Sequence, residues 1–146
     1  MTLYKEPFAK ELRGDLFGNL APYRNGKPHR GMDWHPPAGT IIPAITDGKV
    51  TQVFWSDVLG NVVETFTNDG LYVQYAHLKD KPKSLKKGSL VKLGQSIGRI
   101  GNTGTASTGA HLHLQLAKVP NGHLATYDSL LDPLEHIRKN REPRNP

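Results

Sequence analysis

The chain contains no cysteine. This absence excludes disulfides, thiolate metal sites and a cysteine nucleophile. The sequence also lacks any run of about 18 apolar residues, so we expect no transmembrane helix. Its N-terminal stretch, MTLYKEPFAKELRGDLFG, has no apolar core of the kind that a signal peptide needs. We therefore expect synthesis in the cytoplasm and release by another route, or the earlier removal of a signal.

Acidic residues are outnumbered by basic ones, with 13 Asp and Glu against 19 Lys and Arg and a formal net charge of +6. A basic surface suits an anionic partner, for which nucleic acid and an acidic bacterial wall are the two candidates. The basic residues are scattered, apart from a cluster at 79–87 and a tail at 138–144. A solvated surface explains most of them equally well.

The 146 residues fit one domain spanning 1–146, with an irregular N-terminal segment at 1–15 and a flexible tail at 140–146. The 15 glycines and 11 prolines favour many short strands and turns. Apolar, β-branched or alternating stretches predict strands at 40–45, 48–55, 61–67, 71–77, 89–93, 95–100 and 110–118. A helix is expected from the N-cap Asp132 to about Lys139, with Pro133 in its first turn and Glu135 closing a capping box. The fold class is therefore mainly β: an antiparallel sheet folded into a sandwich or small barrel, with a short C-terminal helix.

The stretch AHLHLQLAK, residues 110–118, alternates almost without a break. In a strand, this pattern places Leu112, Leu114 and Leu116 on one face and His111, His113 and Gln115 on the other. We expect the leucine face to join the core and the histidine face to look into a cleft.

The stretch HRGMD, residues 29–33, adds His29 and Asp33 to these histidines. Pro28 and Gly31 argue against a helix here, so a bend in a loop or strand has to bring the two side chains together. Two imidazoles and a carboxylate with one open position are typical of a hydrolytic zinc site. We expect the third ligand from residues 110–118, where two histidines are available.

Other residues are candidates for the rim of the cleft. His77 ends the apolar stretch LYVQYAHL; taken alone it is a half-exposed histidine at a strand end, and beside a metal it would be an acid or base. The glycine-rich loop (residues 101–109, GNTGTASTG) lacks the Gly-Lys-Ser/Thr ending of a phosphate loop, so we expect it to form one wall of the cleft. Aromatic and imidazole side chains that could line the groove are Tyr23, Trp34, His35, Trp55 and Tyr72, although Trp55 and Tyr72 are more simply core or surface aromatics. His35, His123 and His136 are expected to be structural or exposed rather than ligands.

Taken together, these motifs resemble the LytM/lysostaphin-type zinc endopeptidases, peptidase family M23. The resemblance runs from Leu16 to His136 and rests on several segments in the family's order. They are FGNLAPYRNGKPH, HRGMDWHPPAGTIIPAITDGKV, Tyr-Ala-His-Leu at 75–78, GSLVKLGQSIGRIGNTGTASTGAHLHLQL and the final LDPLEHI.

The resemblance implies a single Zn²⁺ per chain, bound by His29, Asp33 and His113. It also implies that His77 and His111 lie beside the metal and assist catalysis, with their division of labour left open. The implied activity is hydrolysis of peptide bonds in bacterial peptidoglycan, within the stem peptide or its cross-bridge. The lysostaphin/LytM-type, duplicated-hybrid-motif-like fold is implied as well.

We expect two departures from this family pattern: no long propeptide before the first motif and no second domain after the last. The missing signal peptide and the single-domain size lead us to expect a monomeric phage lysin acting on the cell wall, with a bacterial autolysin as the next choice. A non-catalytic zinc-binding regulatory or wall-binding module of the same fold is the main alternative. A basic nucleic-acid-binding β-barrel is a third reading, but it leaves the histidines and Asp33 unexplained, so no nucleic-acid partner is expected.

Overall fold

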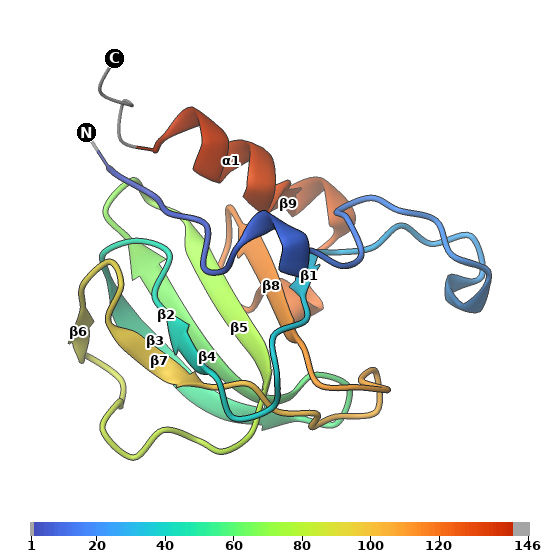
Figure 1. Ribbon diagram of the computed structural model, residues 1–146. Coiled ribbons are helices and arrows are strands. Elements are labelled where there is room, and N and C mark those ends of the chain that lie inside the picture. The colour runs from blue at the N-terminus through green and yellow to red at the C-terminus, as the bar shows by residue number, and fades with distance from the viewer. Residues whose placement is uncertain (1, 142–146) are drawn as a thin grey trace.

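The computed structural model describes residues 2–141, and β-strands dominate this range (Figure 1). The strands are β1 (Met32–Trp34), β2 (Ile41–Pro43), β3 (Gly48–Ser56), β4 (Gly60–Thr67), β5 (Tyr72–Leu78), β6 (Leu90–Val91), β7 (Ser96–Arg99), β8 (Leu112–Ala117) and β9 (Leu130–Leu131). The helix α1 (Pro133–Lys139) follows β9, and the 3-10 helices are η1 (Lys10–Leu12), η2 (Pro22–Arg24), η3 (Gly122–Leu124) and η4 (Tyr127–Ser129). The predicted mainly β fold with a short C-terminal helix is confirmed. Of the tail expected to be flexible, residues 142–146 lie outside the described residues.

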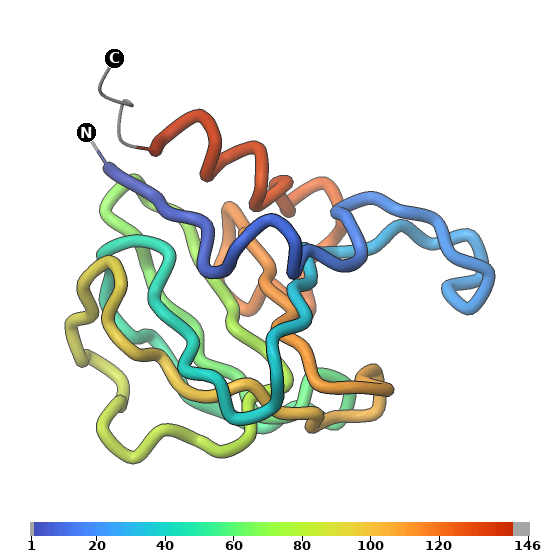
Figure 2. Tube along the Cα trace, viewed as in Figure 1, coloured from blue at the N-terminus to red at the C-terminus, as the bar shows by residue number. Residues whose placement is uncertain are grey.

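Most strands join one antiparallel sheet in the order β1–β8–β5–β4–β3–β6, with β9 also beside β8. A second sheet consists of β2 and β7, which lie in front of the large sheet in Figures 1 and 2. The large sheet stays open, because its edge strands β1 and β6 pair with β8 and β3 but not with each other. Of the two predicted architectures, the barrel is therefore wrong. Packing of the small sheet buries the apolar face, so the large sheet does not have to close on itself.

The core lies between the two sheets. Leu112, Leu114 and Leu116 of β8 are 0 % exposed and belong to this core, as their alternation predicts. The small sheet contributes Ile42 and Ile97 to the same cluster. The opposite face of β8 carries His113 and Gln115. One side of this strand therefore holds the fold together, while the other is free to carry chemistry.

The hairpin between β4 and β5 anchors both ends of the described chain. Its turn at 68–70 contains Gly70, whose φ of 84° suits a residue without Cβ. Asp69 in this turn accepts a hydrogen bond from Tyr4 Oη at 2.7 Å and contacts His136 Nε2 of α1 at 3.0 Å.

The predicted N-cap of α1 is present. The side chain of Asp132 accepts hydrogen bonds from the backbone N–H groups of Leu134 and Glu135. The carboxylate of Glu135 lies 3.2 Å from Lys139 Nζ, one helical turn further on. The sequence therefore located both the start of this helix and the residue that caps it.

Hydrogen bonds of the Glu6 side chain attach the N-terminal segment to the sheet. Its carboxylate accepts hydrogen bonds from Arg13 Nε at 2.7 Å and from Trp34 Nε1 at 2.9 Å. Trp34 is 0 % exposed and belongs to the core, so the expectation that it could line a groove is wrong. Its indole needs a buried partner for Nε1, and Glu6 supplies one. Within the described residues, no helix has the length and apolar character to cross a bilayer.

Glu6 makes a pH-dependent contribution to stability. Burial tends to raise the pKa of its carboxyl, but the hydrogen bonds from Arg13 and Trp34 outweigh this and hold the pKa below its usual range. A carboxyl with a lowered pKa in the folded state stabilises the protein above its unfolded-state pKa of about 4.3, and the contribution is lost as the pH falls through the folded-state value.

We predict that Glu6→Gln lowers the free energy of unfolding by about 1 kcal/mol at neutral pH. The difference from the wild-type protein should shrink in acid, as the pH falls through the lowered pKa of this carboxyl, because Glu6 then becomes protonated. Urea denaturation at neutral and at acidic pH measures this. Glu11→Gln is the matched control, since it removes the same charge from an exposed side chain in the same segment. An equal loss from both variants would show that net charge rather than the Glu6 contacts is responsible.

Candidate metal centre

The pairing of β1 with β8 brings the two predicted motifs together. Asp33 lies directly opposite His113 in the register of the two antiparallel strands. Asp33 Oδ1 is 2.9 Å from His113 Nδ1 and 3.4 Å from His29 Nε2. All three side chains are buried. As expected from Pro28 and Gly31, residues 29–33 run from an extended loop into a strand rather than forming a helix.

His29, Asp33 and His113 could hold a metal ion, because one ligand atom from each lies within 4.8 Å of the other two. The second ring nitrogen of each histidine donates elsewhere: His29 Nδ1 to Leu16 O at 3.1 Å, and His113 Nε2 to Gln115 Oε1 at 2.9 Å. These acceptors leave His29 Nε2 and His113 Nδ1 facing the cluster, the arrangement seen around metal-binding histidines. Two imidazoles and a carboxylate form a donor set that suits zinc.

The carboxyl of Asp33 is held in its charged form. Burial on its own would raise its pKa, but the contacts with His113 and His29 outweigh burial and hold the pKa far below the usual range. A negative charge is therefore present at the centre of the cluster at neutral pH. Such a charge is what a divalent cation requires.

His111, the other histidine available from residues 110–118, does not join this group. Its Nδ1 donates to Gly109 O at 2.8 Å, so Nε2 is the nitrogen left with a lone pair. Its ring centroid lies 4.6 Å from that of His77. Burial lowers the pKa of His111 below that of an ordinary histidine. The structure thus groups His113, the ligand implied by the family resemblance, and not His111 with His29 and Asp33.

His77 reaches the site through an irregularity in β5. Strict alternation would place it with Val73 and Tyr75 in the core, but the β4–β5 register shifts here and His77 has a φ of 61°. Such a bulge redirects one side chain and restarts the alternation with Leu78, which is in the core. His77 Nδ1 donates to Thr103 O at 2.6 Å, which leaves Nε2 with the lone pair.

The side chain of His77 is buried, unlike that of an ordinary residue at a strand end. The side chain is only 2 % exposed, so the expectation of a half-exposed histidine is wrong. Burial lowers its pKa to about 4, although the hydrogen bond to Thr103 opposes this. The residue is thus a neutral imidazole held between the glycine-rich loop and the metal cluster.

The five predicted site residues all line one cleft with a volume of about 780 Å³: His29, Asp33, His77, His111 and His113. The glycine-rich loop contributes Thr105 and Gly109 to its wall, as predicted. Tyr23 and His35 also line the cleft, and the ring of His35 lies 5.5 Å from that of His111. The other imidazole and aromatic candidates have partners elsewhere: Trp55 with Asp57, Tyr72 with Phe66, His123 with Gln74 and His136 with Asp69.

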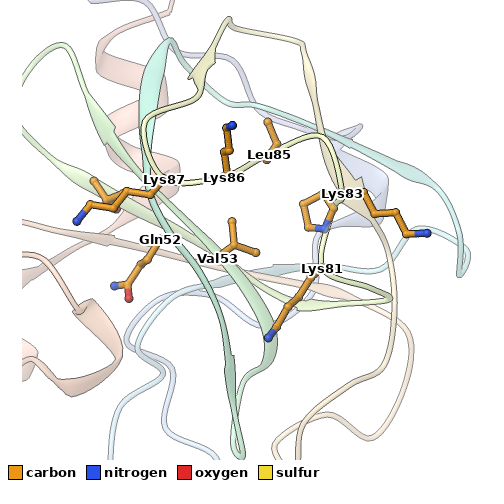
Figure 3. A pocket seen from close by; sticks show the side chains of 9 residues that line it. Gln52, Val53, Lys81, Lys83, Leu85, Lys86 and Lys87 are labelled. Atoms are coloured by element: carbon orange, nitrogen blue, oxygen red, sulfur yellow. The ribbon is translucent and has the colours of Figure 1, made fainter.

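A second hollow, of about 510 Å³, lies between β3 and the basic segment at 79–87, and it shares no lining residue with the cleft. Val53 and Leu85 form part of its lining (Figure 3). The lysines around it are Lys81, Lys83, Lys86 and Lys87. Their side chains point in different directions in Figure 3, so they do not converge on one anion.

Two features of the site carry only a weak signal in the sequence. Thr103 and Leu16 act through backbone carbonyls, which any residue type provides, so their positions could be found only in the structure. Gln115 lies two residues after His113 and therefore on the same strand face. This spacing was visible in the sequence, but nothing in it indicated a contact with His113.

Comparison with known proteins places most of the chain within one family of peptidases. The model of the family described as peptidase family M23 matches residues 27–127. The chain is 42 % identical over 93 residues to glycyl-glycine endopeptidase ALE-1 of Staphylococcus capitis, covering 62 % of this chain and 25 % of the relative. It is 39 % identical over 89 residues to peptidoglycan DD-endopeptidase ShyC of Vibrio cholerae, covering 61 % and 20 %. The chain thus matches about a quarter or less of the length of these curated relatives.

Solved structures match over more of the chain. The catalytic domain of the antimicrobial peptidase lysostaphin from Staphylococcus simulans superposes with a TM-score of 0.75 at 32 % identity, covering 91 % of this chain and 99 % of that one. The catalytic domain of the prophage-encoded M23 protein EnpA from Enterococcus faecalis, solved as a point mutant, superposes with a TM-score of 0.71 at 33 % identity, covering 86 % and 92 %.

We predict that the protein binds one divalent metal ion per chain and that Asp33→Ala abolishes this binding, because the two imidazoles alone leave the cation's charge uncompensated. Metal content after dialysis, measured by mass spectrometry, tests this. Asp57→Ala, which removes an exposed carboxylate outside the cluster, should bind like the wild type. Retention of stoichiometric metal by Asp33→Ala would place the ion elsewhere.

Proposed function

Because the chain belongs to peptidase family M23, we propose that it is a zinc-dependent endopeptidase that hydrolyses peptide bonds of bacterial peptidoglycan. The observation that carries this proposal is the meeting of His29, Asp33 and His113 with two further histidines in a single cleft. A fold alone does not imply an activity, whereas a complete set of ligands and proton-transfer groups in one place supports one.

In this proposal, zinc is held by His29 Nε2, Asp33 and His113 Nδ1, the atoms that already face one another. When bound, zinc supplies an activated water at neutral pH and a Lewis acid for the scissile carbonyl. The protein contributes the orientation of the ligands. Leu16 O and Gln115 Oε1 hold the two imidazoles in the tautomers that expose the required nitrogens.

His111 and His77 are the proposed catalytic residues. The Nδ1 atom of each donates to a backbone carbonyl, so each Nε2 carries a lone pair that can accept a proton. His111 Nε2 takes the proton from the attacking water, because the neutral imidazole has a free lone pair at this nitrogen. His77, bordered by His111 and His113, presents the same lone pair, so its Nε2 first takes up a proton and can then deliver it to the leaving amine or stabilise charge on the carbonyl oxygen.

The proposed substrate follows from the relatives and from charge. ShyC is by name a peptidoglycan DD-endopeptidase and ALE-1 a glycyl-glycine endopeptidase, so the relatives include endopeptidases named for different peptide bonds. The net charge of +6 favours encounter with a wall that carries acidic polymers. No nucleic-acid substrate is needed to explain this charge.

We further propose that the protein is a phage lysin acting at the cell wall. The support is its similarity to the prophage-encoded protein EnpA over 92 % of that chain. One chain supplies all five site residues, so a monomer suffices for the proposed activity.

The proposal predicts that the roles of ligand and proton-transfer histidines separate experimentally. His111→Ala should retain zinc but lower the rate of wall lysis by roughly 10²–10⁴-fold, the contribution of a general base. Turbidity of isolated cell walls measures lysis, and mass spectrometry measures zinc in the same samples. His136→Gln, which changes a histidine outside the cleft, is the control and should lyse walls at the wild-type rate.

Two other outcomes would contradict the proposal. Full activity of His111→Ala would remove this residue from the mechanism. Zinc binding by the wild type without release of new amino groups from any wall type would favour the alternative, a non-catalytic zinc-binding module of the same fold.

A further inference from the structure

Three polar side chains form a row across the sheet that ends beside the candidate metal ligand. Glu64 of β4 lies opposite Gln74 of β5, and Gln74 lies opposite Gln115 of β8. His113 is two residues from Gln115 on the same strand face. All four side chains are buried. The row therefore lines up a carboxylate on β4 with an imidazole of the candidate metal cluster, with hydrogen bonds from Gln74 to Glu64 and between Gln115 and His113.

Glu64 acts only as an acceptor. It is 1 % exposed and receives four donors: Thr51 Oγ1 at 2.8 Å, Gln52 Nε2 at 3.0 Å, Gln74 Nε2 at 2.8 Å and Asn121 N at 2.9 Å. A carboxylate surrounded by donors cannot exchange roles with them, unlike an amide or hydroxyl. The direction of every hydrogen bond that starts here is thus determined.

The acceptor-only carboxylate of Glu64 determines which way the side-chain amide of Gln74 points. Its Nε2 donates to Glu64 and lies 2.9 Å from His123 Nδ1, so both amide protons have acceptors. Its Oε1 must then point the other way, towards Gln115. Gln74 Oε1 and Gln115 Nε2 are the two buried side-chain polar atoms that lack a partner within residues 2–141. One is an acceptor and the other a donor, and both lie 3.7 Å from the position that a Cβ on Gly122 would take.

The orientation of Gln115 completes the row. With Nε2 turned to Gln74, its Oε1 faces His113 and accepts from His113 Nε2 at 2.9 Å. When the proton of His113 is on Nε2, Nδ1 keeps its lone pair and is the nitrogen that can bind a metal in the cluster. A reversed Gln115 amide would instead present an N–H to His113 Nε2 and favour the wrong tautomer.

We propose that Glu64, Gln74 and Gln115 form a polar relay that positions His113 as a metal ligand through Nδ1. The buried carboxylate of Glu64 orients the Gln74 amide by a hydrogen bond, and the Gln74 acceptor oxygen then favours the donor side of Gln115 electrostatically, across a gap beside Gly122 that no direct hydrogen bond closes. Gln115 and Glu64 are thus positioning residues; neither meets the substrate. The inference rests on the proposed role of His113 in metal binding. It adds that a residue two strands away from β8 controls the affinity of the site.

The test uses the affinity for zinc, measured by competition with a chromophoric chelator, together with NMR of the histidine ring N–H protons in the zinc-loaded protein. Gln115→Met removes the acceptor with little change in size, and it should weaken zinc binding roughly tenfold to hundredfold and remove the slowly exchanging His113 Nε2–H signal. Gln115→Glu keeps an acceptor oxygen and should retain most of the affinity.

Glu64→Gln is the decisive variant, because it preserves shape but removes the acceptor-only group. It should weaken zinc binding by about tenfold and broaden or shift the same Nε2–H signal, although the substitution does not touch His113. Thr51→Val is the matched control: it removes one donor to Glu64 but keeps the carboxylate, so zinc affinity and NMR signal should match the wild type. Urea denaturation of each metal-free variant shows that it is folded.

The outcomes separate the two levels of the proposal. If the wild type binds no zinc, or if Asp33→Ala binds it normally, the proposed metal site is wrong. If the wild type binds zinc and Asp33→Ala does not, but Glu64→Gln keeps both the wild-type affinity and the Nε2–H signal, the relay is overturned and the metal site stands.

Discussion

The register between β1 and β8 is the constraint on which the rest of the site depends. Asp33 and His113 are 80 residues apart in the chain, yet they lie opposite each other because a three-residue strand pairs with the histidine strand. A slip of one residue would turn Asp33 to the other face and put a charge into the leucine core. The pairing is therefore enforced by the cost of burying that charge among Leu112, Leu114 and Met32.

A second common feature is how four of the histidines in the cleft are oriented. One ring N–H of each donates a hydrogen bond to a carbonyl oxygen: His29 to Leu16, His77 to Thr103, His111 to Gly109 and His113 to Gln115. Carbonyls only accept, so each contact selects one tautomer and points the other nitrogen into the cleft. Three of these carbonyls belong to the backbone of loops, so the irregular segments directly orient the imidazoles of the site. The exception, Gln115, needs further support for its own orientation, which the row to Glu64 can supply.

The backbone of His77 is conformationally strained where its side chain enters the site. A non-glycine residue with positive φ is strained by roughly 1–3 kcal/mol, and it persists only where the surroundings determine it. Here His77 N donates to Leu59 O at 2.8 Å and the imidazole to Thr103 O. The hydrogen bonds on both sides of the residue offset the strain. Leu78, one position later, returns to the core, so the irregularity is confined to one residue.

The sequence by itself determined the strands β2 to β8, the leucine core, the capped helix and the residue types of the site, because these follow from local periodicity and from motifs a few residues long. It did not predict the short strands β1 and β9. The alternation at 110–118 predicted both faces of β8, and HRGMD predicted two of the three members of the metal cluster. The local pattern at 110–118 left two histidines available, and the family resemblance implied His113, which the tertiary structure places opposite Asp33. Only the tertiary structure decided that Trp34 lies in the core and that the sheet stays open. Each of these depends on pairing between distant segments, which local patterns do not encode. The same holds for His77, because the bulge that redirects it arises from the register between β4 and β5 rather than from the residues around it.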